Sequence, residues 1–389
     1  MNNRAEINTE NSFEINFEEI YELLKEFSPP VYDVKNDKFL NRCQSLFERD
    51  YEIITIPNKD WRLCYSYPSR TGEDLIEAFK NAPLSRCRNR FPVPSILING
   101  RYVCRSATLS GQAEIAWKKI PFVYQLDYVD EARMRDIELL SRLKVRYICD
   151  LMVEDNKIKY GLPVSSSEKA DTENRYKDFD LLVLPYPGCE LFAKLCEKGY
   201  KPINLVYDWQ DPINTVDLKF SENLSSLGVK WEDYEDYRSW NMLEITQNYL
   251  KAILTTLCRS RNGFLVHCIS GWDRTPLFIS LIRLSLWADG LIHASLTPHE
   301  ILYLTLAYDW FLFGHQYEAR MAKREEIMFF CFKMLKYITS SDFSMQPTET
   351  KREQRLLQVY KIFIDIYFHR PDSSSYNSWS AYLPFTIPW

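Results

Sequence analysis

A short loop between an apolar strand and an apolar helix constrains the fold of this chain more than any other segment. Residues 264–266 are apolar and follow a turn at 261–263, which predicts a buried strand, and residues 275–289 predict a helix that ends at Gly290. Cys268 follows the strand, Arg274 precedes the helix, and five residues separate the two. A strand, a tight loop and a helix in this order are expected in an α/β domain.

Strand and helix patterns alternate along the rest of the chain. Strands are predicted at residues 95–98, 102–105, 145–153 and 179–184. Helices are predicted at residues 130–143, 241–257, 316–338 and 355–368, and a capping box at 297–300 starts another. Residues 156–177 are polar and predict a loop or a short hairpin. The alternation indicates an α/β fold with a central, mostly parallel sheet flanked by helices and a largely helical C-terminal half.

One domain between two tails is expected for the 389 residues. Residues 1–18 are predicted to be a flexible N-terminal tail, and residues 371–389 form a C-terminal tail rich in aromatic side chains. Between them, residues 19–370 are predicted to form a single domain. Its N-terminal extension reaches about residue 100, and its catalytic core covers about residues 101–340. The sequence assigns no role to residues 1–85.

Composition and charge exclude several classes of protein. A net charge of -5 argues against a general nucleic-acid binder. The N-terminus has no apolar signal-peptide core, and no run reaches the roughly 18 apolar residues of a membrane span. The ten cysteines include no C-x-x-C pair, which argues against a zinc finger, and without a signal peptide we expect reduced thiols and not a disulfide framework. We expect a cytoplasmic protein that contacts membranes only peripherally, through local patches.

The loop from Cys268 to Arg274 has the residues of an anion-binding cradle. A loop this tight can turn its backbone N–H groups inward, and the following helix N-terminus adds partial positive charge. Gly271 lets the chain bend sharply, and the planar fork of Arg274 can hold two phosphate oxygens. Cysteine beside these charges ionises to a thiolate, which can attack a bound phosphate. The prediction is a phosphatase that works through a phospho-cysteine and uses no metal or other cofactor.

Other side chains are candidates for the remaining steps. Asp273 is the nearest acid for protonating the leaving oxygen, with Asp208 and Asp211 as alternatives that more often serve as loop residues. Thr275 is placed to donate a hydrogen bond to the sulfur. His267 is expected to orient the loop through its backbone and not to act as a base.

Several residues near the loop keep two interpretations open. Trp272 either packs under the loop or contacts substrate. The basic cluster at residues 86–90 is either a solvated face or a contact for phosphate or membrane. The basic residues Arg320, Lys323 and Arg324 are equally ambiguous, although they could border the pocket.

Four segments together resemble the myotubularin phosphoinositide phosphatases, most strongly over residues 86–340. They lie at residues 104–109, 185–190, 266–280 and 308–315. The resemblance is to a divergent branch of the family, and it implies the tyrosine-phosphatase-like fold. It also implies removal of the 3-phosphate from phosphatidylinositol 3-phosphate and 3,5-bisphosphate, and restraint of autophagy. It assigns Cys268 as nucleophile, Arg274 as phosphate ligand and Asp273 as general acid, and the residues that contact substrate are expected to be Ile269, Ser270, Gly271, Trp272 and Thr275.

The chain departs from the family pattern at the loop itself. Most active members have Ser-Asp after the cysteine, whereas this chain has Ile269 and Ser270. The long polar region of the relatives has no counterpart after Ser344, where only residues 345–353 separate two helices. A protein tyrosine or dual-specificity phosphatase shares the same loop chemistry and is the alternative enzyme. A lipid-binding scaffold with weak catalysis is the alternative outside that class.

Overall fold

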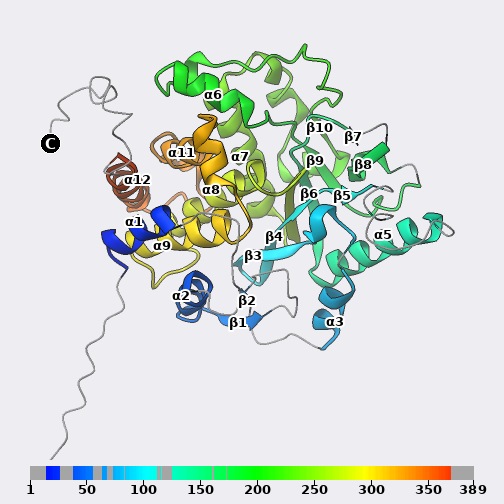
Figure 1. Ribbon diagram of the computed structural model, residues 1–389, viewed down its shortest axis with the longest axis horizontal. Coiled ribbons are helices and arrows are strands. Elements are labelled where there is room, and N and C mark those ends of the chain that lie inside the picture. Colours follow the sequence, from blue (N-terminus) through cyan, green and yellow to red (C-terminus); the bar gives the residue numbers. More distant parts are fainter. Residues whose placement is uncertain are drawn as a thin grey trace, which may run out of the picture.

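A computed structural model describes residues 15–26, 38–55, 64–67, 73–82, 84–111, 115, 125–159, 162–171 and 173–368. Within them a six-stranded sheet has the order β10-β9-β6-β11-β4-β3 (Figure 1). The four inner strands are parallel, namely β4 (Arg101–Ala107), β6 (Val145–Asp150), β9 (Asp180–Val183) and β11 (Gly263–Cys268). The edge strands β3 (Val93–Ile98) and β10 (Lys219–Phe220) are antiparallel to their neighbours.

The loop predicted to carry the chemistry leaves the centre of this sheet. β11 pairs with β4 on one side and with β6 on the other. All six residues of β11 are buried, as expected for a parallel strand covered on both faces. Because the inner strands are parallel, their carboxyl ends meet at one edge of the sheet, where open α/β sheets bind ligands. Cys268 is the last residue of β11 and lies at that edge.

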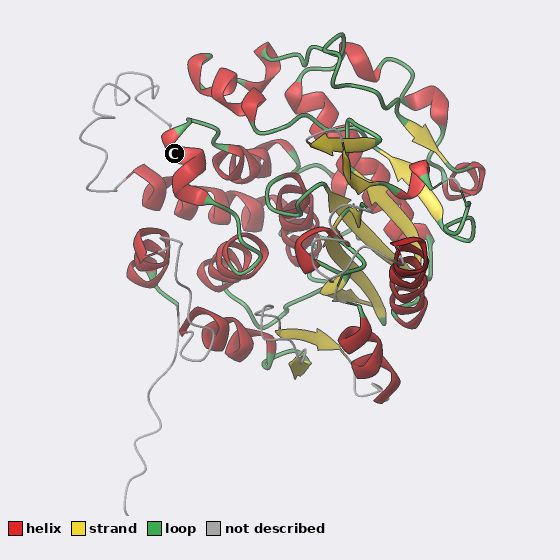
Figure 2. Cartoon of the chain, turned by 45° about the vertical axis from the view of Figure 1, so that its right-hand side comes forward, coloured by secondary structure: helices red, strands yellow, loops and turns green. Residues whose placement is uncertain are grey.

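Helices cover both faces of the sheet (Figures 1 and 2). On one face α8 (Arg274–Ala288) packs against β11, with α7 (Met242–Arg259) and α11 (Ile327–Lys333) beside it. On the other face α5 (Gln125–Arg142) packs against β6. All fifteen residues of α8 are buried, which explains its apolar composition. The described residues contain no helix with the length and apolarity needed to cross a bilayer.

An outer helical layer joins the two ends of the described chain. α12 (Arg352–Phe368) packs against α8 and α9 (Pro298–Leu304), and α1 (Phe17–Glu26) lies against α9 and α12 (Figure 1). Ile15 is buried and α1 begins at Phe17, so ordered structure starts inside the expected tail of residues 1–18. Residues 1–14 and the expected C-terminal tail lie outside the described residues.

Smaller elements complete the described domain. A two-stranded sheet pairs β1 (Glu52–Thr55) with β2 (Cys64–Tyr67), near α2 (Lys38–Phe47) and α3 (Glu73–Asn81) (Figure 1). A three-stranded sheet has the order β5-β8-β7, and its strands are β5 (Leu109–Ser110), β8 (Leu162–Ser166) and β7 (Asn156–Lys159). α6 (Glu190–Glu197) follows β9, and α9 continues into a π-helix, η8 (Thr305–Phe311), that the sequence did not predict.

The structure confirms the predicted fold class, with its mostly parallel sheet and flanking helices. The turn at 99–100 connects β3 to β4, the polar stretch at 156–177 contains the hairpin of β7 and β8, and Thr297 caps α9 in a capping box with Glu300. These features were predictable because turn residues and caps act locally.

The single long helix predicted for residues 316–338 is wrong. The chain forms α10 (Tyr317–Ala322), α11 and a 3₁₀ turn, η9 (Met334–Tyr337). α10 ends where Arg324 adopts a left-handed conformation with φ of 58°. In this broken arrangement Arg320 forms ion pairs with both Glu325 and Asp273. The helical spacing of apolar residues could not reveal these polar contacts, which hold the break in place.

Candidate active site

β4 shapes the loop between β11 and α8. Gly271 has φ of +73°, and a Cβ atom there would lie only 2.9 Å from the carbonyl oxygen of Ser106. Arg105, on the same strand, donates from Nη2 to the carbonyl oxygen of Gly271 at 2.8 Å. Glycine is therefore required here, both for its backbone conformation and for the close approach of the loop to β4.

Two donors converge on the sulfur of Cys268. The backbone N–H of Gly271 lies 3.3 Å from Sγ, and the hydroxyl of Thr275 lies 3.1 Å from it. The thiol is 3% exposed, at the inner end of the loop. Hydrogen bonds from an amide and a hydroxyl stabilise negative charge on sulfur. Thr275 thus lies where the sequence placed it.

The ends of two further strands hold Arg274. Its Nη1 donates to the carbonyl oxygens of Leu151 and Tyr186, both at 2.9 Å. Leu151 directly follows β6, and Tyr186 lies three residues after β9. No acceptor in the described part of the chain is recorded for Nε or Nη2 of this guanidinium. These groups can therefore donate to two oxygens of a phosphate held in the loop.

Asp273 precedes α8, but its side chain does not cap that helix. The carboxylate instead accepts from Nδ1 of His315 at 2.9 Å and from Nη2 of Arg320 at 2.7 Å. Burial would raise the pKa of Asp273, but the hydrogen bonds and charges of His315 and Arg320 outweigh it and hold the pKa well below its usual range. Asp273 is therefore ionised in this arrangement, and the helix N–H groups are left for an anion.

The alternative acids Asp208 and Asp211 form local turns. The carboxylate of Asp208 accepts from the backbone N–H of Gln210, and that of Asp211 accepts from the backbone N–H of Ile213, both at 3.0 Å. Both aspartates are exposed. These contacts are typical of aspartates that stabilise a loop.

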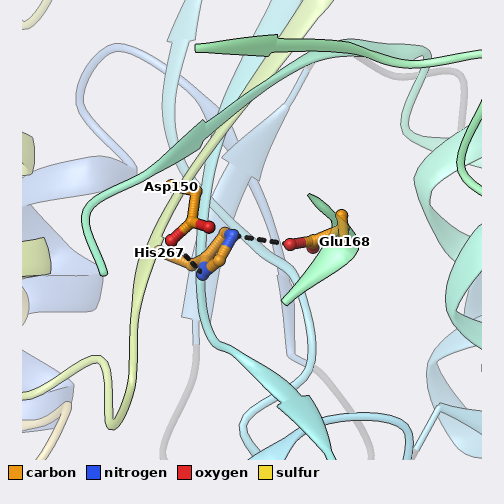
Figure 3. A group of neighbouring side chains, drawn as sticks. All are labelled: Asp150, Glu168 and His267. Carbon is orange, nitrogen blue, oxygen red and sulfur yellow. Dashed lines mark ion pairs between the residues drawn. The ribbon is translucent and has the colours of Figure 1, made fainter. Parts of the chain in front are cut away.

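His267 is fully buried in a polar cluster with Asp150 and Glu168 (Figure 3). Its Nε2 lies 2.9 Å from the carboxylate of Glu168, and its Nδ1 lies 4.0 Å from that of Asp150. Its backbone carbonyl accepts from the N–H of Leu151. Both the side chain and the backbone of His267 are therefore fixed, and Cys268 is the next residue in the chain.

The spacing within this cluster is short enough for a metal ion. One ligand atom from each of Asp150, Glu168 and His267 lies within 4.8 Å of the others. However, Arg86 forms a 2.8 Å ion pair with Glu168, and Lys169 forms one of the same length with Asp150. Because protein cations already neutralise both carboxylates, we interpret the cluster as an ion-pair network that holds His267.

The basic cluster at 86–90 is divided between core and surface. Arg86 is fully buried, so it does not lie on a solvated face. Arg88 is exposed and donates to the hydroxyl of Ser270, while Arg90 is half-buried and donates to the carbonyl of Ser270 at 3.0 Å. Their guanidinium carbons lie 4.4 and 4.3 Å from the ring centre of Trp272. Trp272 is therefore packed against arginines at the rim of the loop.

Comparison with known protein families identifies the domain. The family of the myotubularin-like phosphatase domain matches residues 6–369. The chain belongs to this family. The match confirms the family inferred from the loop and its flanking segments.

Curated myotubularins with similar sequences include human and mouse proteins, both named phosphatidylinositol-3,5-bisphosphate 3-phosphatase MTMR14. Each is 42% identical to this chain in alignments that are 387 and 388 positions long, and each alignment covers 85% of this chain and 59% of the relative. The human phosphatidylinositol-3,5-bisphosphate 3-phosphatase MTMR4 is 26% identical over 147 residues, or 36% of this chain and 11% of that protein. The chain thus spans about three fifths of the length of its two MTMR14 relatives.

Several residues that build the site of this myotubularin domain were not singled out from the sequence. Arg105 and His315 lie in segments that were quoted only for their resemblance, and Glu168 lies in the polar stretch expected to be a loop. Each acts through a contact with a residue more than 40 positions away. Such contacts leave no local spacing signal in a single sequence.

Proposed function

We propose that this domain is a cysteine-dependent phosphatase that removes the 3-phosphate from phosphatidylinositol 3-phosphate and phosphatidylinositol 3,5-bisphosphate. The observation that carries the proposal is the sulfur of Cys268, which receives two hydrogen bonds inside a loop closed by Arg274. The names of the MTMR14 relatives state a 3-phosphatase acting on the bisphosphate. We extend that activity to this chain, together with peripheral membrane contact, cytoplasmic location and restraint of autophagy.

The reaction proceeds in two displacements at phosphorus. In the first, Sγ of Cys268 forms a bond to phosphorus, and the bond from phosphorus to the 3-oxygen of the inositol breaks. Arg274 and the loop N–H groups stabilise the charge on the phosphoryl oxygens. In the second, water attacks phosphorus, the sulfur leaves as thiolate, and inorganic phosphate is released. The hydroxyl of Thr275 stabilises the departing sulfur.

Asp273 is the proposed proton donor to the leaving oxygen. Its ion pair with Arg320 opposes that role, because it favours the carboxylate. A phosphate dianion entering the loop adds negative charge beside Asp273 and shifts its equilibrium back toward the protonated form. His315 and Arg320 then position the carboxyl group and control its protonation.

Phosphate release from a substrate panel tests the proposed activity. The panel contains mono- and bis-phosphorylated phosphoinositides and phosphotyrosine peptides, with Cys268→Ser as the control. We expect 3-phosphorylated lipids to be preferred and the Cys268→Ser protein to be inactive. Preference for phosphotyrosine peptides would identify a protein phosphatase, and full activity of Cys268→Ser would contradict the mechanism. Cellular rescue by Cys268→Ser would indicate a scaffold.

Leaving-group dependence tests the assignment of the acid. Asp273→Asn is expected to slow the first step most for substrates with poor leaving groups, which need the proton. Asp208→Asn and Asp211→Asn are the matched controls, because both aspartates are exposed and lie outside the loop. If either control shows this dependence and Asp273→Asn does not, the assignment is wrong.

A further inference from the structure

Two arginines from the segment before β3 lie against the rim of the catalytic loop. Arg88 and Arg90 both donate to Ser270, and both guanidinium groups lie over the ring of Trp272. Ser270 lies two positions after Cys268 in the loop. Arg88 is exposed, so a ligand in the loop can reach its guanidinium from solvent.

The segment that carries these arginines is fixed to the core at both ends. Arg86 forms buried ion pairs with Asp136 and Glu168, each at 2.8 Å. The N–H of Cys87 donates to the carbonyl of Thr108, and the carbonyl of Arg90 accepts from the N–H of Ala107. A side chain carried by so constrained a backbone can be preorganised for a ligand.

The backbone between these anchors has an unusual conformation. Arg88 and Asn89 both have φ of 56°, in the left-handed region that residues other than glycine rarely adopt. This conformation costs roughly 1–2 kcal/mol for arginine and less for asparagine, and backbone strain of this kind clusters at ligand-binding sites. In this conformation the chain directs Arg88 onto the loop, whereas Arg86, two residues earlier, is buried.

Positive charge accumulates around this rim. Burial and the neighbouring charges of Arg88 and Arg105 lower the pKa of Arg90 well below its usual value. Position 270 is an uncharged serine, and the nearby charge of Asp273 offsets the repulsion at Arg90 only in part. The carboxylate of Asp273 is held by Arg320 and His315. An anion bound beside the loop would relieve the repulsion between the arginines.

Trp272 adds a buried hydrogen-bond donor to the rim formed by the two arginines. Its indole Nε1 is buried and has no hydrogen-bond acceptor among the described residues. Gly314 packs against this edge, where a Cβ atom would lie 3.2 Å from Nε1 and 2.5 Å from Nη2 of Arg90. The tryptophan and the two arginines therefore form one packed unit at the rim.

We propose that Arg88 and Arg90, supported by Trp272, bind a second phosphate group of the inositol headgroup whose 3-phosphate occupies the loop. The proposal rests on the function proposed above and adds a specificity-determining site to it. Arginine suits this role because its planar fork can donate two hydrogen bonds to one phosphate. Ser270 then acts as a neutral spacer between the two phosphate sites.

The chemistry of the headgroup provides two sources for this second phosphate. Carbons 1 and 5 of the inositol ring both lie two positions from carbon 3. Carbon 1 carries the phosphodiester that joins the lipid, and carbon 5 carries a monoester in the 3,5-bisphosphate. With the 3-phosphate held in the loop, either group can extend toward the rim at Ser270.

Three soluble substrates distinguish these sources. Short-chain phosphatidylinositol 3-phosphate has only the diester as a second phosphate, and the short-chain 3,5-bisphosphate has both groups. Inositol 3-phosphate has neither, so it reports on the loop alone. Arg88→Ala is the test variant because Arg88 is exposed. Arg261→Ala is the matched control, since Arg261 is also exposed but lies before β11, at the opposite end of the strand from the loop.

Arg88→Ala is expected to lower kcat/KM about 10- to 100-fold for a substrate with a phosphate at the rim, the range for one charge-assisted hydrogen bond. A loss confined to the bisphosphate identifies the 5-phosphate, and a loss for both lipids identifies the diester. In either case the loss on inositol 3-phosphate is much smaller than the loss on the affected lipid, and Arg261→Ala behaves as wild type.

An equal loss on all three substrates would overturn the proposal, because Arg88 would then only support the loop. No loss on any substrate would overturn it as well. Failure of the proposed function has a different signature, because the wild-type protein would then release no phosphate from either lipid. A thermal unfolding midpoint for Arg88→Ala equal to that of the wild type excludes a folding defect.

Discussion

The hydrogen bond from Thr275 to Cys268 is expected to assist hydrolysis of the phospho-cysteine but not its formation, and this difference can be tested. Its hydroxyl donates to Sγ of Cys268 at 3.1 Å, and the residue is fully buried at the start of α8. In the first step the sulfur gives up its negative charge to form the bond to phosphorus. In the second step the sulfur regains that charge as it leaves. The hydrogen bond therefore assists the second step and not the first.

Thr275→Val removes the hydroxyl and nearly preserves the volume and branching of the side chain. A hydrogen bond to a charged group contributes about 1.5–3 kcal/mol. At about 1.4 kcal/mol for each tenfold change in rate, its loss slows hydrolysis of the phospho-cysteine by roughly 10- to 150-fold. Formation of the intermediate keeps nearly its original rate, so the phospho-enzyme accumulates.

Rapid-quench kinetics and intact-protein mass spectrometry measure this accumulation. We expect a stoichiometric burst of dephosphorylated lipid from Thr275→Val, followed by slow turnover and a protein heavier by one phosphoryl group. Thr275→Ser is the control, because it keeps the hydroxyl and should retain most of the wild-type turnover. A Thr275→Val protein with unchanged turnover, or one slowed equally in both steps, would refute the reasoning.

Three further substitutions test two buried ion-pair networks and the bend of the loop. For Glu168, burial would raise the pKa, but His267 and Arg86 outweigh it and hold the pKa well below its usual range. Its charge therefore stabilises the fold fully above about pH 4.3, and this stabilisation is lost as the pH falls further. Glu168→Gln should lower the free energy of unfolding by about 3–5 kcal/mol at pH 7. It should also reduce the loss of stability at low pH, as measured by urea unfolding at several pH values. The buried Arg283 pairs with Asp309 at 2.7 Å, and Asp309→Asn leaves this arginine without a carboxylate. The substitution should lower the free energy of unfolding by a similar amount, which is measured as a lower thermal unfolding midpoint. Gly271→Ala should lower kcat/KM about 100-fold by displacing the loop, while circular dichroism shows the fold retained.

Sequence patterns predicted those elements whose causes are local. The hairpin of β3 and β4 follows from Asn99 and Gly100, and the start of α9 follows from the capping box of Thr297. The buried strand β11 and the apolar helix α8 followed from runs of apolar residues. In each case the signal and the structure that it specifies lie within a few residues of each other, so no distant contact was needed.

Prediction failed where a distant charge decided the local conformation. The apolar spacing of residues 316–338 fits a helix, but Arg320 pairs with Asp273 in the loop, and the chain breaks at Arg324. Arg283 likewise lies in an apolar run, and its partner Asp309 belongs to a π-helix that has no simple sequence signature. Periodicity describes which face of an element is apolar, but it does not describe which charges meet.

The site shows the same division between local and distant causes. The motif was enough to place Cys268, Arg274 and Thr275 together, because a strand, a tight loop and a helix N-terminus leave few other arrangements. It was not enough to place His315 beside Asp273, since these residues are 42 positions apart. The identity of the proposed nucleophile is therefore a property of the motif, whereas control of the proposed acid depends on the whole domain.

The loop geometry is set by the sheet as much as by the motif itself. Each parallel strand supplies one constraint: β11 carries Cys268, β4 fixes Gly271 through Arg105, and carbonyl groups following β6 and β9 hold Arg274. A change at any of these strand ends should therefore alter activity without touching a residue of the motif. The segment before β3 also contacts the loop, where Arg88 and Arg90 donate to Ser270. Since that segment is tied to the end of β4, the sheet that positions the proposed nucleophile also positions the proposed site for a second phosphate.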